Sequence, residues 1–407
     1  MQEASPGADA AIQARQGGRD ALALALQASR ADTLATFEAF ERVLDGLQVP
    51  LHAELNPPLW ELGHVGWFQA YWVLRNPQRE HGVRADPEAP RAPGEPANAD
   101  ELYHSGRVPH DDRWRLPLPD ARATRGQLQR QLDATLALLA EAPEHDDALY
   151  FFRLALLHED MHHEAALRMA QALGIAIDDP RWRARPLPAP PARLALPAGR
   201  WRMGSPETAG FAFDNESPVP ELPMRACEID AQVVRWAEYL PFVEAGGYAQ
   251  PRWWSAVGRK WLSESGACAP RYLRRDGANW RQWRHGRWQA LEPAEAACHL
   301  THHEAQAWCR WAGRKLPCEA DWERAAVTLG PRFRWGDVWE WTSSAFAPFP
   351  GFVAHPYREY SAPWFDGRPV LRGASFMTQP RMRHARYRNF FQAWRSDVPA
   401  GFRSCAA

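Results

Sequence analysis

The sequence has almost no net charge, no long apolar run and few cysteines, and each of these absences excludes a class of protein. Its 48 basic and 49 acidic residues leave a formal net charge of −1, so we expect neither a nucleic acid nor a membrane as partner. No apolar run is long enough to span a bilayer, and the polar N-terminus lacks the apolar core of a signal peptide. The six cysteines form no CxxC pair, so we expect reduced thiols in a cytoplasmic protein.

Tryptophan and proline, in contrast, are abundant, with 21 and 36 residues. Tryptophan buries a large area and keeps a polar N–H group. Many aromatic rings among Gly and Pro in the C-terminal half therefore predict a loop-rich domain held together by packed rings. A chain of 407 residues is long enough for two domains with separate cores. We predict an α+β protein of two domains without an internal repeat.

The N-terminal part has apolar residues at helical spacing, which predicts a four-helix bundle. The predicted helices cover residues 20–47, 58–75, 124–142 and 146–173. The Pro-rich crossover between the second and third helices is of a length typical of functional or disordered loops. Two short helices are expected in the C-terminal part, at 305–312 and 319–326. The expected organisation is a flexible lead 1–18, a helical bundle 19–180, a linker 181–196 and a second domain 197–407.

Histidines carry the clearest chemical signal in the sequence. His158 and His162 are four residues apart on the fourth predicted helix, so their side chains share one face. His64 on the second predicted helix offers a third ligand. Three neutral histidines from two helices would hold an iron or zinc ion with open positions, as a catalytic metal site requires. An enzyme is therefore the leading interpretation.

Other interpretations of the same histidines remain open. His158-Glu159-Asp160-Met161-His162 also matches the H-E-x-x-H pattern of zinc proteases, in which Glu159 would be the general base. The histidines could instead only form hydrogen bonds at a bundle surface, and the C-terminal domain could be a non-catalytic binding module. The neighbouring His163 and Glu164 are interpreted as groups that support the ligands or face solvent.

Longer motifs make a resemblance to one enzyme family specific. Leu62-Gly63-His64-Val65-Gly66-Trp67-Phe68 and His158-Glu159-x-x-His162-x-Glu164 resemble the N-terminal DinB-like helical bundle of the ergothioneine sulfoxide synthases, which are non-heme iron enzymes. The C-terminal half resembles the formylglycine-generating-enzyme-like (sulfatase-modifying-factor-like) fold, a loop-rich C-type-lectin-like domain. Its matching segments are 211–216, 242–248, 311–323, 338–344, 370–376, 388–390 and 401–403. Together the matches follow in order along nearly the whole chain.

This resemblance implies a set of ligands and site residues. His64, His158 and His162 would bind Fe(2+), and Tyr357 or Tyr360 would donate a proton or hydrogen atom near the metal. Asn389 and Phe390 match positions that line the pocket for hercynine, the trimethylated betaine of histidine. The small-molecule substrates would be hercynine, dioxygen and a donor of sulfur or selenium. The lone Cys405 argues against formylglycine-generating activity, which requires paired cysteines.

Two departures from the family pattern concern the substrates. Met161 stands where these synthases often carry a Gln that contacts substrate, and Phe391 replaces an acidic residue that helps to hold an amino-acid donor. Arg395, the expected partner of that acid, remains. Segments 55–64 and 75–79 resemble most the selenoneine synthase branch, which joins selenium from a selenosugar to hercynine. The alternative is a thiol donor, cysteine or γ-glutamylcysteine, held by Arg113 or Arg388.

Overall fold

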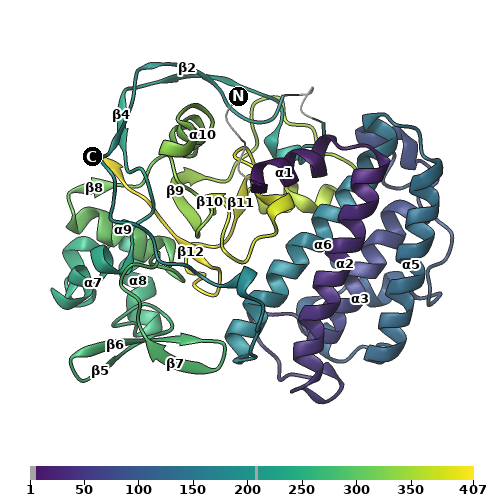
Figure 1. Cartoon of the computed structure of the whole chain (residues 1–407), viewed down its shortest axis with the longest axis horizontal. Coiled ribbons are helices and arrows are strands. Elements are labelled where there is room, and N and C mark those ends of the chain that lie inside the picture. Colours follow the sequence, from purple (N-terminus) through teal and green to yellow (C-terminus); the bar gives the residue numbers. More distant parts are fainter. Residues whose placement is uncertain (1–5, 207–209) are drawn as a thin grey trace.

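Residues 6–206 and 210–407 are described by a computed structural model of the chain, whose helical N-terminal part packs beside a mixed C-terminal part (Figure 1). The N-terminal helices are α1 (Pro6–Gln16), α2 (Arg19–Glu41), α3 (Pro58–Gln69), α4 (Ala99–Tyr103), α5 (Ala121–Glu141) and α6 (Asp146–Leu173). Four of them, α2, α3, α5 and α6, are long and lie side by side, and α6 contacts both α2 and α3. The predicted helical half is therefore present, with four long helices.

Local sequence signals explain where these helices begin and end. Pro58 occupies the first turn of α3, where its missing N–H costs nothing,. The carboxylate of Asp120 accepts a hydrogen bond from the N–H of Ala123 and caps α5,. Gly174 ends α6 with φ of +73°, the left-handed conformation that favours glycine,. The bounds of α6 agree with the prediction of 146–173, and α3 continues through a π-helical segment at Ala70–Leu74.

The predicted flexible lead is wrong for residues 6–16, which form α1. The order comes from a contact that is distant in sequence. The guanidinium of Arg15 forms two hydrogen bonds of 2.8 Å with the carboxylate of Glu216, and both side chains are buried. A short segment of small polar residues does not reveal such a partner 201 residues away.

The C-terminal part contains short strands and four helices around irregular loops. Its helices are α7 (Trp236–Glu244), α8 (Ala256–Ser265), α9 (His302–Trp311) and α10 (Glu319–Thr328). Its strands are β1 (Leu194–Leu196), β2 (Gly199–Arg202), β3 (Glu221–Met224), β4 (Cys227–Ile229), β5 (Leu273–Asp276), β6 (Asn279–Arg284), β7 (Arg287–Ala290), β8 (Arg314–Lys315), β9 (Trp339–Ala345), β10 (Pro369–Gly373), β11 (Asn389–Phe390), β12 (Ala400–Gly401) and β13 (Cys405–Ala406). The two predicted short helices correspond to α9 and α10.

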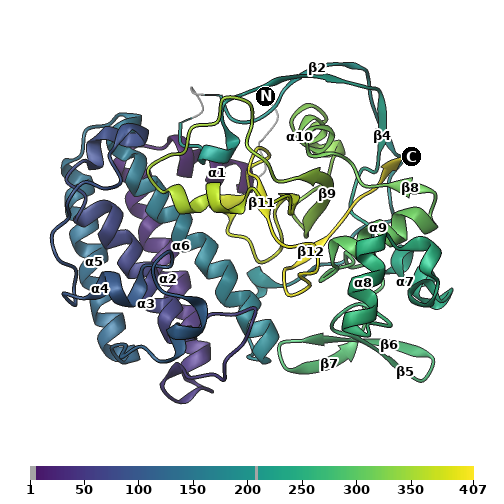
Figure 2. The same cartoon turned by 180° about the vertical axis from the view of Figure 1, so that it is seen from behind.

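Two four-stranded sheets organise this half, with strand orders β1-β4-β13-β8 and β11-β10-β9-β12. The central strands β9 and β10 are antiparallel, and β12 joins β9 in parallel. Trp339 and Trp341 of β9 are buried, as packing by aromatic rings predicts. Strand β1 begins at Leu194, so the C-terminal end of the expected linker 181–196 belongs to this sheet. Figure 2 shows the same sheets from behind.

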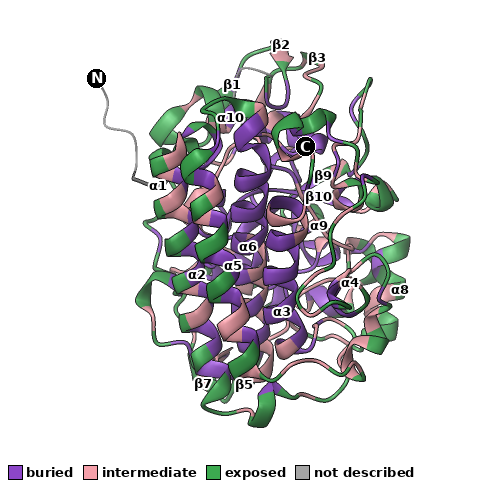
Figure 3. Ribbon diagram, turned by 90° about the vertical axis from the view of Figure 1, so that its right-hand side faces the viewer, coloured by how far each residue is buried: buried purple, intermediate pink, exposed green. Residues whose placement is uncertain are grey.

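Helix α6 lies at the interface between the two halves, and most of its residues are buried (Figure 3). Asp160 accepts hydrogen bonds of 2.8 and 2.9 Å from Arg381. His163 contacts Gln379 at 3.2 Å, and Glu164 accepts hydrogen bonds from Trp339 and Thr378. His163 and Glu164 therefore do not face solvent, because they bind the C-terminal half. No helix among the described residues is long and apolar enough to cross a membrane.

Candidate metal centre and substrate cavity

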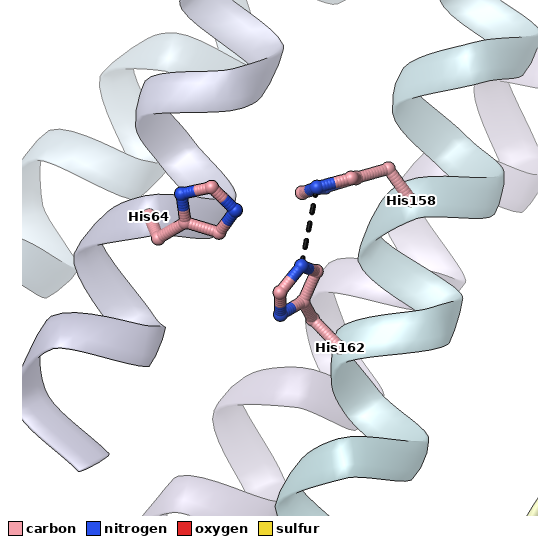
Figure 4. Close-up of side chains that lie close together, drawn as sticks. All are labelled: His64, His158 and His162. Carbon is pink, nitrogen blue, oxygen red and sulfur yellow. Dashed lines mark hydrogen bonds between the residues drawn. The ribbon is translucent and has the colours of Figure 1, made fainter. Parts of the chain in front are cut away.

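The three predicted histidines meet between α3 and α6, with His64 on α3 and the other two one turn apart on α6 (Figure 4). One ring nitrogen of each lies within 4.8 Å of the others. The Nε2 atoms of His158 and His162 are 3.1 Å apart. The residue types and their spacing thus form one cluster, as the sequence predicts.

Hydrogen bonds at the outer ring nitrogens set the tautomers of two of these histidines. The Nδ1–H of His64 donates to the backbone oxygen of Tyr103 at 2.8 Å, and the Nδ1–H of His162 donates to Glu61 at 2.6 Å. A carbonyl and a carboxylate only accept hydrogen bonds. In the neutral form of each ring the Nε2 atom therefore carries the lone pair, which is the state that a metal ion requires.

Packing around the rings fixes their orientation. The ring of His158 stacks on Phe68, with ring centroids 3.4 Å apart, and its Nδ1 has no hydrogen-bond partner among the described residues. His64 stacks on Trp60. Gly63 lets the ring of Tyr103 approach α3, because an added Cβ would lie 2.4 Å from that ring. The glycine beside His64 thus permits the contact that places the carbonyl of Tyr103.

Burial disfavours a second proton on His64 and His158, while the contact with His162 keeps the carboxylate of Glu61 charged. Burial lowers the pKa of His64 to about 3, with a further lowering by the charge of His162. The pKa of His158 is lowered well below its usual range by burial and by the two other histidines. Burial alone would raise the pKa of Glu61, but the charge and hydrogen bond of His162 lower it to about 2. The neutral imidazoles of His64 and His158 and the ionised carboxylate of Glu61 fit a site for a divalent cation,.

A cavity of about 760 Å³ lies beside the histidines, at the interface between the two halves. Both halves contribute to its wall, so the cavity is a cleft between the two halves of the chain. Most of the predicted site residues line it, namely His158, His162, Met161, Tyr357, Tyr360, Asn389, Phe390, Phe391 and Arg113. His64 lies behind the wall, 2% exposed. Arg395 does not line the cavity, because its guanidinium binds Asp397 at 2.5 and 2.6 Å.

Comparisons with known proteins agree with this architecture. The family model of the sulfatase-modifying factor enzyme 1-like domain matches residues 182–337. The chain is 30% identical to the hercynine oxygenase of Mycolicibacterium smegmatis, over 95% of this chain and 98% of that protein. It is also 30% identical to the hercynine oxygenase of Mycobacterium tuberculosis, over 94% and 97%. A formylglycine-generating enzyme of Streptomyces coelicolor is 33% identical over 40% of this chain and 58% of its own length.

The chain belongs to the hercynine oxygenase family. This confirms the resemblance to ergothioneine sulfoxide synthases and the prediction that the protein is an oxidoreductase. The sulfatase-modifying-factor-like nature of the C-terminal half is likewise confirmed over residues 182–337.

The two candidate tyrosines of this hercynine oxygenase relative have different surroundings. Tyr360 donates to the hydroxyl of Tyr387 at 2.9 Å, and Tyr387 contacts the sulfur of Met161 at 3.4 Å. The ring of Tyr357 lies against the ring of Phe68. Its centroid is 6.1 Å from the centroid of the His158 ring. Its hydroxyl has no hydrogen bond within the described part of the chain. Burial raises the pKa of Tyr357, so its hydroxyl stays protonated at neutral pH.

Glu159 is not available as the general base of a zinc hydrolase. Its carboxylate forms hydrogen bonds of 2.8 and 3.0 Å with Arg30 of α2, and both side chains are buried. It therefore points away from the face that carries His158 and His162. Arg388, one candidate for holding a thiol donor, is likewise committed to an ion pair with Glu319, at 2.9 Å.

Sequence reasoning missed several residues of this site. Glu61 lies in the quoted motif around His64, but its bond to His162 depends on how α3 meets α6. Arg113 supports the carboxylate of Glu61 through Asn56. Arg113 donates a hydrogen bond to Asn56, and Asn56 donates one to Glu61, both at 2.7 Å. Further cavity residues that sequence reasoning missed are Arg168, Glu359, Trp364 and Tyr387. Of these, Arg168 follows His158 and His162 on the same helix, which periodicity could have indicated.

Proposed function

We propose that the protein is an iron(II)- and dioxygen-dependent synthase that joins the selenium of a selenosugar to the imidazole of hercynine. The observation that carries the proposal is the cluster of His64, His158 and His162, with two Nε2 lone pairs fixed toward one point. Relatives named hercynine oxygenase support hercynine as the acceptor. The helical half would be a DinB-like bundle, in which inward side chains of facing helices hold the metal.

Iron bound at these histidines would supply the activation of dioxygen and of the chalcogen. In a sulfoxide-type reaction, the imidazole carbon loses its hydrogen and the selenol loses its own. Both leave as water with one oxygen atom of dioxygen, and the other oxygen atom ends on the selenium. The residues of the chain orient the two substrates and exclude water. Tyr357 would hold or donate a proton, because its hydroxyl is protonated and free of protein partners,.

The cavity wall suits a betaine acceptor. A quaternary ammonium donates no hydrogen bonds and is recognised by aromatic faces. Tyr357, Tyr360 and Phe390 supply such faces, and the carboxylate of Glu359 has no ion pair or hydrogen bond within the described residues. Asn389 would contact the polar end of hercynine. Met161 offers a thioether where an amide would otherwise contact substrate.

The donor side of the cavity suits a neutral molecule. Phe391 occupies the position at which a carboxylate would pair with the ammonium group of an amino-acid donor. Trp364 lines the same cavity with 40% of its surface exposed, and its N–H donates to the backbone oxygen of Glu359 at 3.0 Å. The guanidinium carbon of Arg368 lies 4.8 Å from the centre of this ring, so a sugar ring would contact the part of the indole that remains exposed,. The alternative is a sulfoxide synthase that uses cysteine or γ-glutamylcysteine, with Arg113 near the donor.

Product mass spectrometry tests the proposal. Protein purified without oxygen would be loaded with iron(II) and supplied with hercynine, dioxygen and one donor at a time: a selenosugar, a thiosugar, cysteine or γ-glutamylcysteine. We expect the selenosugar conjugate as the main product. Efficient use of γ-glutamylcysteine would favour the alternative. Oxygen-independent hydrolysis with bound zinc would refute both, and hercynine binding without oxygen consumption would indicate a binding module.

A further inference from the structure

Arg168 of α6 is a cation in the cavity wall with hydrogen-bond donors to spare. Its side chain is 15% exposed and lines the cavity beside Phe391, whose ring centre lies 5.1 Å from the guanidinium carbon. One N–H group donates to Asp397 at 3.2 Å. The remaining N–H groups of this guanidinium have no partner among residues 6–206 and 210–407. The other arginine of the wall, Arg113, already donates to Asn56, Ser105 and Val108.

The carboxylate of Asp397 does not neutralise Arg168 by itself. Arg395 binds the same carboxylate through two shorter hydrogen bonds, of 2.5 and 2.6 Å. The nearby Arg271 is paired with Glu54 at 2.8 Å. Three guanidinium groups thus share two carboxylates. Glu164 forms no ion pair with Arg168, since neutral donors bind its carboxylate. Around Arg168 the arginines therefore outnumber the carboxylates that pair with them, and its unused donors favour an anionic group of the ligand.

The position of Arg168 along α6 relates it to the histidines. His158, Met161, His162, Ala165 and Arg168 all line the cavity from the same helix. Arg168 lies six residues beyond His162, which is about 9 Å along the helix axis. A long side chain on a helix tends to point back toward the N-terminus, which for Arg168 is the direction of the histidines. A substrate with its imidazole at the histidines and an acidic group at its other end would lie between them.

We propose that Arg168 binds the carboxylate of the betaine acceptor. The inference rests on the proposed function, in which hercynine is that acceptor. A guanidinium binds a carboxylate through two charge-assisted hydrogen bonds and so fixes its orientation. The acceptor thereby occupies Arg168, which has more unpaired N–H groups than Arg113 within the described residues, and Glu359 and the aromatic rings of the same cavity would face its quaternary ammonium. A donor with further carboxylates would have only one other arginine among the described residues of this wall, Arg113, three of whose N–H groups are already used, which gives a physical reason for a neutral donor.

A binding measurement with two ligands tests the assignment without turnover. Hercynine and its decarboxylated analogue share the imidazole and the quaternary ammonium and differ only in the carboxylate. Equilibrium dialysis without oxygen would give the Kd of each for the wild-type protein, Arg168→Gln and Arg168→Lys. We expect Arg168→Gln to raise the Kd of hercynine about 10- to 100-fold, as the loss of a charge-assisted pair implies, and to leave the analogue unaffected. Arg168→Lys should recover part of the affinity, because lysine keeps the positive charge but cannot form the two parallel hydrogen bonds of a guanidinium.

Each other outcome overturns the assignment in a distinguishable way. Equal weakening of hercynine and the analogue by Arg168→Gln would mean a merely structural role. If Arg168→Gln left the Kd of hercynine unchanged but raised the KM of an acidic thiol donor, Arg168 would bind a carboxylate of the donor instead. Failure of the wild-type protein to bind either ligand would refute the proposed function itself. Thermal unfolding of each variant would confirm that the fold is retained.

Discussion

Glu61 provides the sharpest test of the metal centre, because it touches a proposed ligand without being one. Its carboxylate is 1% exposed, accepts the Nδ1–H of His162 at 2.6 Å and accepts a second bond from Asn56 at 2.7 Å. Glu61→Gln keeps the shape and one oxygen acceptor for His162 but removes the negative charge. Glu61→Ala removes both. The two variants therefore separate the charge of the carboxylate from its orienting role.

The expected effect is a loss of iron affinity. A carboxylate that orients a ligating histidine also makes the imidazole a better electron donor, and removing such a group typically costs about 10- to 100-fold in metal affinity. That range corresponds to about 1.4 to 2.8 kcal/mol. We expect Glu61→Gln near the lower end, because the hydrogen bond can persist, and Glu61→Ala near the upper end, because Nδ1 then loses its partner.

Competition with a chelator under anaerobic conditions would measure these iron(II) affinities. Glu159→Gln is the matched control, since Glu159 is also a buried carboxylate in the same region but binds Arg30 instead of a histidine. We expect the control to lower stability and to keep wild-type iron affinity. Wild-type affinity in folded Glu61→Ala would refute the claim that Glu61 fixes the ligand.

Three further changes test other parts of the structure. Phe391→Asp should lower kcat/KM for a neutral sugar donor by roughly one to two orders of magnitude and raise the activity with γ-glutamylcysteine, as product mass spectrometry would show; an unchanged donor preference would contradict the proposed role. Tyr357→Phe should retain iron but lose about 100-fold or more in turnover if the hydroxyl handles a proton, so full turnover would exclude it. Burial raises the pKa of Glu304 from 4.5 to about 7, against the effect of hydrogen bonds from Tyr248 and Thr301. The folded state thus favours the protonated carboxylic acid of Glu304, and about 3 kcal/mol of stability present below pH 4.5 is lost as pH rises through 7. Urea unfolding at pH 5 and 8 would measure this loss, and Glu304→Gln should remove it. An unaltered pH dependence of stability in Glu304→Gln would contradict the assignment to Glu304.

Some parts of the fold could be predicted from the sequence because the signals are local. Helix α6 has continuous apolar periodicity and a glycine directly after its last residue, so both of its ends were predictable. Helix α1 was not predictable, because its order depends on Arg15 reaching Glu216 far along the chain. The C-terminal strands are two to seven residues long, and their pairing depends on loops that carry no periodic signal.

The site divides in the same way. The spacing of His158 and His162 predicts a shared helix face, since that geometry belongs to a single helix. The role of Glu61 requires knowledge of how α3 packs on α6. The placement of Arg395 against Asp397 likewise depends on tertiary contacts. Residue types indicated the proposed metal site, but the hydrogen bonds that orient its histidines come from packing.

The seven residues 158–164 explain why the position of the histidine cluster depends on contacts with both halves of the chain. Successive side chains on a helix point in different directions, and here each direction has its own partner. His158 and His162 face His64, Glu159 binds Arg30 of α2, and Asp160, His163 and Glu164 bind the C-terminal half. Met161 reaches Tyr387 across the cavity. One rigid helical segment thus fixes the distance from the histidines to the cavity wall of the other half, so a change at this interface should alter substrate placement even where every histidine is retained.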